Sequence, residues 1–358
     1  MSARARALSG CLFLYFLATS PAALHGADAS DTPTSGITPP APALETPKGR
    51  FSFDLATNLS FGEGREYVYV NSIIGSELLW PLMPSAGAGL ALDWEAPTGF
   101  TFRAAFDAGL PGKTGYMTDR DWMNVFQTPT VTSDDWLTHY SRHDNILMES
   151  VDLEGSLGWT FAVPGKEDAP TRPRLSLEAG FRYRWLHWEA RDGYIHYSWY
   201  PDYLPPGGIY PELNEEDESY AMSGTGIIYR QEWLMPFARL ALAWQAGERV
   251  ELSLNAALYP WLSCTGVDDH ILRNARFFDY TSGGAAVEIG GGVSVQTGRH
   301  TSLFIDAKYL HTSILRGDTV AYTLSTLSYA GTYPLKDGGG GGAAFQGLNL
   351  HMGLRLRR

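Results

Sequence analysis

Cysteine is almost absent from this chain of 358 residues, which contains only Cys11 and Cys264. Cys11 falls in an N-terminal segment that we expect to be removed, so Cys264 has no partner for an intrachain disulfide and is interpreted as a small packing residue. Long apolar runs are also missing, because none reaches the roughly 18 residues that a membrane-spanning helix needs. These absences exclude a disulfide framework and a helical membrane anchor within the folded part of the chain.

Positive charge is scarce as well. The chain has 27 Lys and Arg residues against 39 Asp and Glu residues, a net charge of −12, which argues against nucleic acid as a partner. Metal-ligand spacing is missing: His139 and His143 are four positions apart, which places two side chains on one face only in a helix, and their surroundings predict a loop. We expect no metal and no other cofactor.

The N-terminus has the features of an export signal. Arg4 and Arg6 precede a short apolar segment at residues 11–18, and Ala27 and Ala29 form an A-x-A cleavage pattern. We predict a signal peptide over residues 1–29, with the exact cleavage site open. Residues 30–49 are rich in Pro, Thr and Ala, which predicts a disordered leader, and residues 50–358 remain as the folded domain.

Several segments alternate strictly between apolar and polar residues. The clearest are residues 175–185, 250–258 and 303–309, and this period of two is typical of strands with one buried face. A soluble sandwich and a membrane barrel both fit the pattern. The export signal, the length of the segments, the polar Gly-rich stretches between them and the aromatic residues near strand ends favour the barrel. We predict an all-β fold, a ten-stranded antiparallel transmembrane β-barrel with long extracellular loops.

Two pairs of chemically active side chains occur at a spacing of two. Asp119 and Asp121 form one pair, and Asp268 and His270 form the other. In a strand, residues i and i+2 point to the same face, so each pair is held on one wall. Two adjacent carboxylates repel each other unless a water or cation lies between them, and an acid beside a histidine is an arrangement for general base catalysis. Two such walls facing each other would hold a water.

Four short segments resemble the omptins, a family of aspartyl-type proteases of bacterial outer membranes. MTDRDWM at residues 117–123 resembles the omptin acidic pair, and VDDHI at 267–271 resembles the omptin Asp-x-His pair. THYSRH at 138–143 and the segment beginning AGF at 179–181 resemble two further omptin segments. Near the start, the segment containing Glu66 resembles the omptin segment that carries an acidic floor for a basic side chain.

The resemblance implies a ten-stranded barrel with its active site in a groove at the outer rim. It implies that Asp119 and Asp121 are the catalytic carboxylates and that Asp268 orients His270 as the base. Ser141 is interpreted as a residue of the groove and not as a nucleophile, because the two acid pairs already form a complete set for activating water. The resemblance also gives three substrate-binding residues: Glu66, His139 and Ser141.

Some positions depart from the omptin pattern. Gly266 stands where the family has a second acid for the basic-residue pocket, and His139 replaces an acid, so Glu66 is left to bind a basic residue on one side of the cut. Glu232 replaces a family arginine on the outer face. Aromatic residues replace other members of the family's lipopolysaccharide clamp: Phe181, Tyr183 and Trp185. We therefore expect an activating lipid, if one is needed, to differ from lipopolysaccharide.

The sequence thus predicts an outer-membrane endopeptidase, with its active site facing outside, that cleaves peptides or proteins at or next to basic residues. The alternative is a surface adhesin, a barrel that binds host proteins without catalysis, which Gly266 and His139 favour. A third hypothesis is a small channel or a lipid-modifying barrel. Charged side chains expected inside the barrel would fill a narrow lumen instead of lining a pore: Glu178, Arg182, Arg184, Glu251, Asp306 and Lys308.

Overall fold

The computed structural model describes residues 49–127, 136–163, 173–198, 209–215, 217 and 219–358. The predicted signal peptide and nearly all of the predicted leader lie outside these residues. From Pro47 onward the chain forms one compact unit. Among the described residues, no helix has the length and apolar character to cross a membrane.

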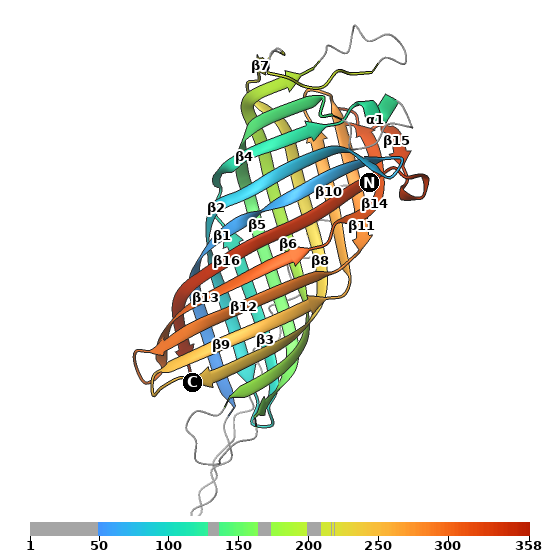
Figure 1. Cartoon of the computed structure of the whole chain (residues 1–358). Helices are drawn as coiled ribbons and strands as arrows, with labels where there is room; N and C mark the ends of the chain where they lie inside the picture. The colour runs from blue at the N-terminus through green and yellow to red at the C-terminus, as the bar shows by residue number, and fades with distance from the viewer. Residues whose placement is uncertain (1–48, 128–135, 164–172, 199–208, 216, 218) are drawn as a thin grey trace, which may run out of the picture. The chain divides into compact units, whose positions relative to one another are not determined.

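The unit is a single sheet of antiparallel strands joined mostly in chain order (Figure 1). A short helix, α1 (Asn124–Gln127), and a 3-10 turn at Leu335–Asp337 are the helical segments of the described chain. The strands are β1 Arg50–Val70, β2 Ile73–Glu95, β3 Phe100–Gly109, β4 Gly112–Asp121, β5 His139–Ala162, β6 Arg174–Tyr197, β7 Ser219–Ala221, β8 Thr225–Gln245, β9 Val250–Tyr259, β10 Leu262–His270, β11 Ala275–Gly283, β12 Ala286–Gln296, β13 Thr301–Thr312, β14 Leu315–Thr323, β15 Tyr329–Tyr333 and β16 Gly341–Arg357.

The sheet has sixteen strands in place of the predicted ten, because four long arms are each interrupted once. β3 continues as β4, β9 as β10, β11 as β12, and β13 as β14, while β7 and β15 are short additions at one end. Pro111 and Pro260 cause two of the breaks, since proline has no N–H for the ladder. Gly283 and Gly284 cause a third with φ angles of 90° and 62°. Counted as continuous arms, the long strands of the described chain number ten, as the sequence predicts.

The sheet closes on itself. β1 pairs with β2 along one edge and with β16 along the other, and every other long arm also has a neighbour on each side. A closed sheet leaves no long edge of unpaired backbone groups, which a lipid environment requires. The fold is therefore a β-barrel.

Apolar side chains cover the outside of the barrel. Leu55 on β1, Leu254 on β9, Ile289 on β12 and Leu303 on β13 each expose more than half of their surface. They alternate with inward polar residues, which confirms the strand assignments at residues 175–185, 250–258 and 303–309. This apolar belt is the surface that a membrane barrel presents to lipid.

At the upper end of the barrel in Figure 1, where β7, α1 and β15 lie, the outer face carries charged side chains. On the outer face of β1 and its neighbours, Leu59 is followed by Glu63 and Arg65. Arg65 contacts Glu77 of β2 at 3.3 Å, and Arg120 of β4 contacts the same carboxylate at 3.9 Å. A charged outer face is costly in lipid, so the upper end extends beyond the membrane.

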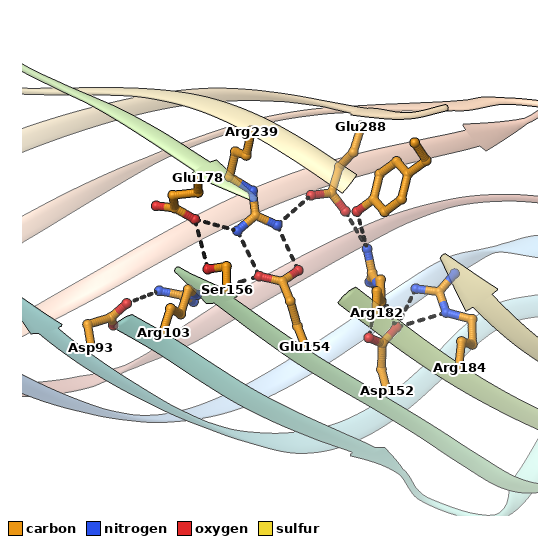
Figure 2. Close-up of polar contacts among 11 residues, drawn as sticks. Asp93, Arg103, Asp152, Glu154, Ser156, Glu178, Arg182, Arg184, Arg239 and Glu288 are labelled. Carbon is orange, nitrogen blue, oxygen red and sulfur yellow. Dashed lines mark hydrogen bonds and ion pairs between the residues drawn. The ribbon is translucent and has the colours of Figure 1, made fainter. Parts of the chain in front are cut away.

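Ion pairs fill the lumen at the level of the belt (Figure 2). Arg182 contacts Asp152 at 2.8 Å and Glu288 at 2.5 Å, and Arg239 contacts Glu154 at 2.7 Å. The six charged residues predicted to lie inside the barrel all lie on inward positions of their strands. Two cavities in this region measure about 50 and 40 Å³. A wider cavity of about 750 Å³, lined by Glu178 and Glu251 among others, opens at the end of the barrel opposite β7, α1 and β15. Above it the ion pairs bridge the arms and fill the lumen, which disfavours the channel hypothesis.

Candidate active site at the upper end of the barrel

The acidic couple, Asp119 and Asp121, lies on the inner face of β4 near its end. β4 pairs with β2 and β5, and the register places Asp119 beside Ser141 and Asp121 beside His139. Both carboxylates are only 9 % exposed. The Ser76 hydroxyl donates a hydrogen bond of 3.2 Å to Asp119 Oδ1. The period-two spacing therefore holds two carboxylates on one wall, as predicted.

The Asp–His pair, Asp268 and His270, lies on the inner face of β10. His270 Nε2 is 2.5 Å from Asp268 Oδ2, and the imidazole ring meets Phe277 edge-on, with ring centroids 5.6 Å apart. These two contacts fix the ring plane. Because Asp268 takes Nε2, Nδ1 is the nitrogen left to face a water.

A cleft brings the two walls together. Asp119 and His270 both line a cavity of about 60 Å³, with Ser141, Tyr197 and Arg273 among the other lining residues. That volume is sufficient for a water molecule, and the lining offers it several polar partners. The structure therefore places residues of the acidic couple and of the Asp–His pair around one common space.

The electrostatics of the cleft favour a protonated acidic couple. These groups lie above the apolar belt, outside the membrane-spanning part of the barrel. Burial, followed by the charge of Asp121, raises the pKa of Asp119 to about 8, and burial also raises the pKa of Asp121. Two adjacent carboxyls that ionise unfavourably titrate as a pair. The couple therefore retains a proton near neutral pH.

The pKa of His270 is shifted in the opposite direction to that of an ordinary buried histidine. Burial disfavours its cation, but the charge of Asp268 and the hydrogen bond to it outweigh burial, so the pKa of His270 is raised above its usual value. An imidazole with a raised pKa is a stronger base when neutral. The arrangement thus combines a proton-holding carboxyl pair with a histidine that readily takes up a proton.

Arg273 is a cleft residue that sequence reasoning missed. The four-residue turn Ile271–Asn274 between β10 and β11 brings its side chain to the cleft. Its positive charge lowers the pKa of both members of the acidic couple, and it interacts with Tyr197. The only sequence signal was a basic residue three positions after His270.

Ser141, one of the predicted substrate-binding residues, lines the cleft. His143 Nδ1 donates to the carbonyl oxygen of Asp192 at 2.6 Å. His143 Nε2 therefore accepts a hydrogen bond from the Ser141 hydroxyl at 2.9 Å. The hydroxyl is oriented along the wall by this contact, and the tautomer of His143 follows from the carbonyl partner.

His139 lies behind the acidic couple and does not line the cleft. Its ring packs against Tyr197, with centroids 4.1 Å apart, and against Tyr210 at 5.2 Å. Its Nδ1 lies 3.0 Å from the Thr138 hydroxyl. Burial lowers the pKa of His139 to about 4, so the ring is neutral at pH 7. These contacts make His139 a support for the wall, whereas the sequence predicted a substrate contact.

Glu66 lies inside the barrel below the cleft lining, on the inner face of β1. It is 2 % exposed, and its Oε2 has no hydrogen-bond partner. Burial raises the pKa of Glu66 well above its usual value, and the charges of Asp268, Asp279 and Asp119 raise it further. Within the described residues, no three His, Cys, Asp or Glu side chains are arranged to hold a metal ion. Glu66 therefore belongs to a group of interacting carboxyls that also contains Asp119, Asp268 and Asp279.

The fold and the cleft together define a membrane β-barrel with an acid-and-histidine site at the end that extends beyond the lipid. The Omptin family model matches residues 47–356, so the chain belongs to the omptin family of bacterial outer-membrane proteases. This confirms the resemblance drawn from the four short segments. It also confirms the predicted location in the bacterial outer membrane.

One of the similar solved structures agrees on the fold. The outer membrane protease OmpT from Escherichia coli is similar to the chain with a TM-score of 0.71 and 19 % identity, covering 88 % of this chain and 99 % of OmpT. The translocator domain of the autotransporter NalP from Neisseria meningitidis follows with a TM-score of 0.29, 12 % identity and coverage of 86 % and 89 %. The first similarity supports the barrel fold alone, and the second is too low to support an argument. No curated protein sequence matches the chain.

Proposed function

We propose that the protein is an endopeptidase of the bacterial outer membrane that hydrolyses peptides at or next to basic residues, with its cleft facing the cell exterior. The observation that carries the proposal is the single cleft lined by both Asp119 and His270. A water held there lies between His270, a base, on one wall and Asp119, a carboxyl of the proton-holding couple, on the other. That combination is what direct hydrolysis of an amide requires.

In the proposed mechanism, His270 Nδ1 removes a proton from the water as it attacks the scissile carbonyl carbon. Asp268 holds the ring through Nε2 and stabilises the imidazolium that forms, the part that a carboxylate plays in hydrolase triads. The protonated acidic couple donates a hydrogen bond to the carbonyl oxygen as negative charge develops there. His270 then returns its proton to the leaving amine, and no acyl-enzyme forms.

Ser141 offers a rival mechanism, because its hydroxyl already donates to His143 Nε2. A Ser–His arrangement of this kind is the starting point of nucleophilic catalysis. The two mechanisms separate cleanly in the variants Ser141→Ala and His270→Ala. If His270 activates water, cleavage survives Ser141→Ala and is lost in His270→Ala. If an acyl-enzyme forms on Ser141, cleavage is lost in Ser141→Ala and survives His270→Ala, and a fluorophosphonate labels Ser141.

The function is tested with quenched fluorescent peptides and barrel refolded in detergent. One peptide carries Arg-Arg, and a matched peptide carries Arg-Ala. We expect cleavage that disappears in His270→Ala while heat-modifiable gel mobility shows that the barrel remains folded. Absence of cleavage by a folded wild-type barrel, with and without added outer-membrane lipid, refutes the protease and leaves the adhesin, whose binding to host protein survives His270→Ala.

We further propose that an activating lipid, if one acts, is not held by a cationic clamp. On the outer face near the upper end, Glu232 lies across the β6–β8 pair from Trp185. The Trp185 indole donates to Glu149 at 3.1 Å. These two positions are acidic and aromatic, and Arg230, the nearby cation on the same strand, is already paired with Asp269. We expect lipopolysaccharide to leave the cleavage rate within about twofold, and a tenfold activation by it overturns this proposal.

A further inference from the structure

Positive charge is in excess around the cavity of about 750 Å³ at the lower end of the barrel in Figure 1, opposite the cleft. This lower cavity is lined by the first residues of β1, the last residues of β16 and the adjoining ends of β2, β3, β6 and β9. Leaving Arg358 at the chain end aside, the lining contains six arginines and four acidic residues. The lower cavity therefore carries an excess of two positive charges.

The alternation of the strands directs arginines into the lower cavity. On β16, Arg355 and Arg357 alternate with Leu356, which is exposed on the outer face. Arg355 donates two hydrogen bonds of 2.8 Å to Asp54 on the inner face of β1. Arg50 lies four positions before Asp54 on the same strand and therefore shares its face. The ends of these two neighbouring strands thus present guanidinium groups to the lumen and not to lipid.

The acids of the lower cavity are already paired with arginines. Glu95 contacts Arg174 at 2.9 Å. Glu251 contacts Arg357 at 2.6 Å, and Arg174 and Arg355 lie 3.7 and 3.9 Å from the same carboxylate. The other two acids of the lining contact arginines at 2.6 and 3.3 Å. All four carboxylates are therefore engaged, and one of them is shared by three cations.

Two arginines of the lower cavity remain without a partner. Arg50 at the start of β1 and Arg299 in the turn between β12 and β13 are exposed, and neither makes an ion pair or a side-chain hydrogen bond within the described chain. Both lie beside the end of β16, where Arg357 pairs with Ser52 of β1 and its N–H donates to the His300 carbonyl at 2.8 Å. Cations gathered in this way repel one another unless an anion lies among them.

We propose that the lower cavity binds the phosphate groups of a multiply charged anion through Arg50, Arg299 and Arg357. Guanidinium groups bind phosphate through paired N–H donors, and a phosphate offers three acceptor oxygens that several arginines can share. A volume of about 750 Å³ lies within the usual range of small-molecule sites. With the cleft facing the cell exterior, the lower cavity faces the periplasm, so this site is separate from the proposed endopeptidase.

The test is calorimetric titration of the refolded barrel with pyrophosphate in an uncharged detergent, with no peptide present. We expect saturable binding that weakens at least about tenfold in the double variant Arg50→Gln, Arg299→Gln, because two charge-assisted hydrogen bonds are lost. Neither side chain has a partner within the described residues, so the double variant leaves no carboxylate unpaired and folds as the wild type does.

Arg120→Gln is the matched control, because it removes an exposed arginine from the outer face of β4 at the other end of the barrel. We expect it to bind pyrophosphate as the wild type does. Absence of saturable binding by the wild-type barrel refutes the site. Binding that is unchanged in the double variant, or equally weakened in Arg120→Gln, also overturns the inference, because either result assigns the binding to surface charge in general.

Lipid discs then identify the source of the phosphate, which is either a soluble compound or the headgroup of an anionic lipid. The titration is repeated in discs that contain phosphatidylglycerol and in discs that contain an equal charge of oleate, which has no phosphate. If the lipid headgroup fills the lower cavity, pyrophosphate binds at least about tenfold more weakly in the phosphatidylglycerol discs. Equal binding in both kinds of disc assigns the site to a soluble phosphate compound.

Discussion

Replacing Asp279 with Asn is predicted to change how the stability of the barrel depends on pH. Burial, opposed by the Thr319 hydrogen bond and reinforced by the charge of Asp268, raises the pKa of Asp279 from 3.8 to about 7. In the folded barrel the carboxyl thus keeps its proton up to about pH 7, while in the unfolded chain it loses it near pH 4. Folding then becomes less favourable as pH rises between these two values.

The magnitude follows from the same two values. A rise from 3.8 to about 7 is worth about 4 kcal/mol at roughly 1.4 kcal/mol per pKa unit. Part of this belongs to the interaction with Asp268, so we expect about 2 to 4 kcal/mol from Asp279 alone. The difference in unfolding free energy, Asp279→Asn minus wild type, should therefore rise by that amount between pH 4 and pH 8.

The assay is urea unfolding in detergent, followed by tryptophan fluorescence. Trp80 and Trp188 are fully buried and report on the upper half of the barrel. Other titrating groups are common to both proteins and cancel in the difference. Glu232→Gln, which removes an exposed carboxyl from the outer face, is the control for the loss of one acid. A difference between Asp279→Asn and wild type that stays constant from pH 4 to pH 8 refutes the reasoning.

Three further predictions concern the cleft and the lumen. Asp268→Asn removes the charge that raises the pKa of His270, so the acid limb of the remaining pH–rate profile should move to lower pH. An acid limb that does not move excludes His270 as the titrating base. Arg273→Ala removes a charge that lowers the pKa of the acidic couple, so the alkaline limb on the same peptide should move to higher pH; an unmoved limb means that the couple does not control it. Arg239→Leu leaves Glu154 buried without its partner and should lower the unfolding free energy in urea by about 3 to 5 kcal/mol, whereas a loss below about 1 kcal/mol would show that neighbouring cations compensate.

The parts of the fold that follow local rules were predictable from sequence. The alternation at residues 175–185 reports which face of β6 meets lipid, because side-chain direction in a strand depends only on position parity. The spacing of Asp119 and Asp121 placed both on one wall for the same reason. Pro111 and Pro260 are visible in the sequence, but whether a proline ends a strand or only interrupts an arm depends on the neighbouring strands, so the ten arms were predictable and their division into sixteen strands was not.

The parts of the site that depend on contacts between distant segments were not predictable. The segment THYSRH does not indicate that His139 packs against Tyr197 and Tyr210. Arg273 reaches the acidic couple only because the turn after β10 is four residues long. The motif around each residue says nothing about these contacts, since the partners belong to other arms of the barrel.

Gly266 of β10 lies directly opposite Asp279 of β11 in the antiparallel register, so a comparison of motifs along the chain does not show which acids a barrel wall holds. Directly opposed residues of an antiparallel pair have Cβ atoms about 5 Å apart, so an acid that changes strands moves by little more than one side chain's width. Along the chain the same acid is a whole hairpin away, so a comparison of sequence motifs counts it as missing. In a closed barrel each inward residue has an opposed residue on both neighbouring strands. The charge of a pocket therefore depends on several adjacent strands and not on one segment of the sequence. The residues that set the charge of the cleft should therefore be sought on every arm and turn that borders it, as Arg273 on the turn after β10 shows.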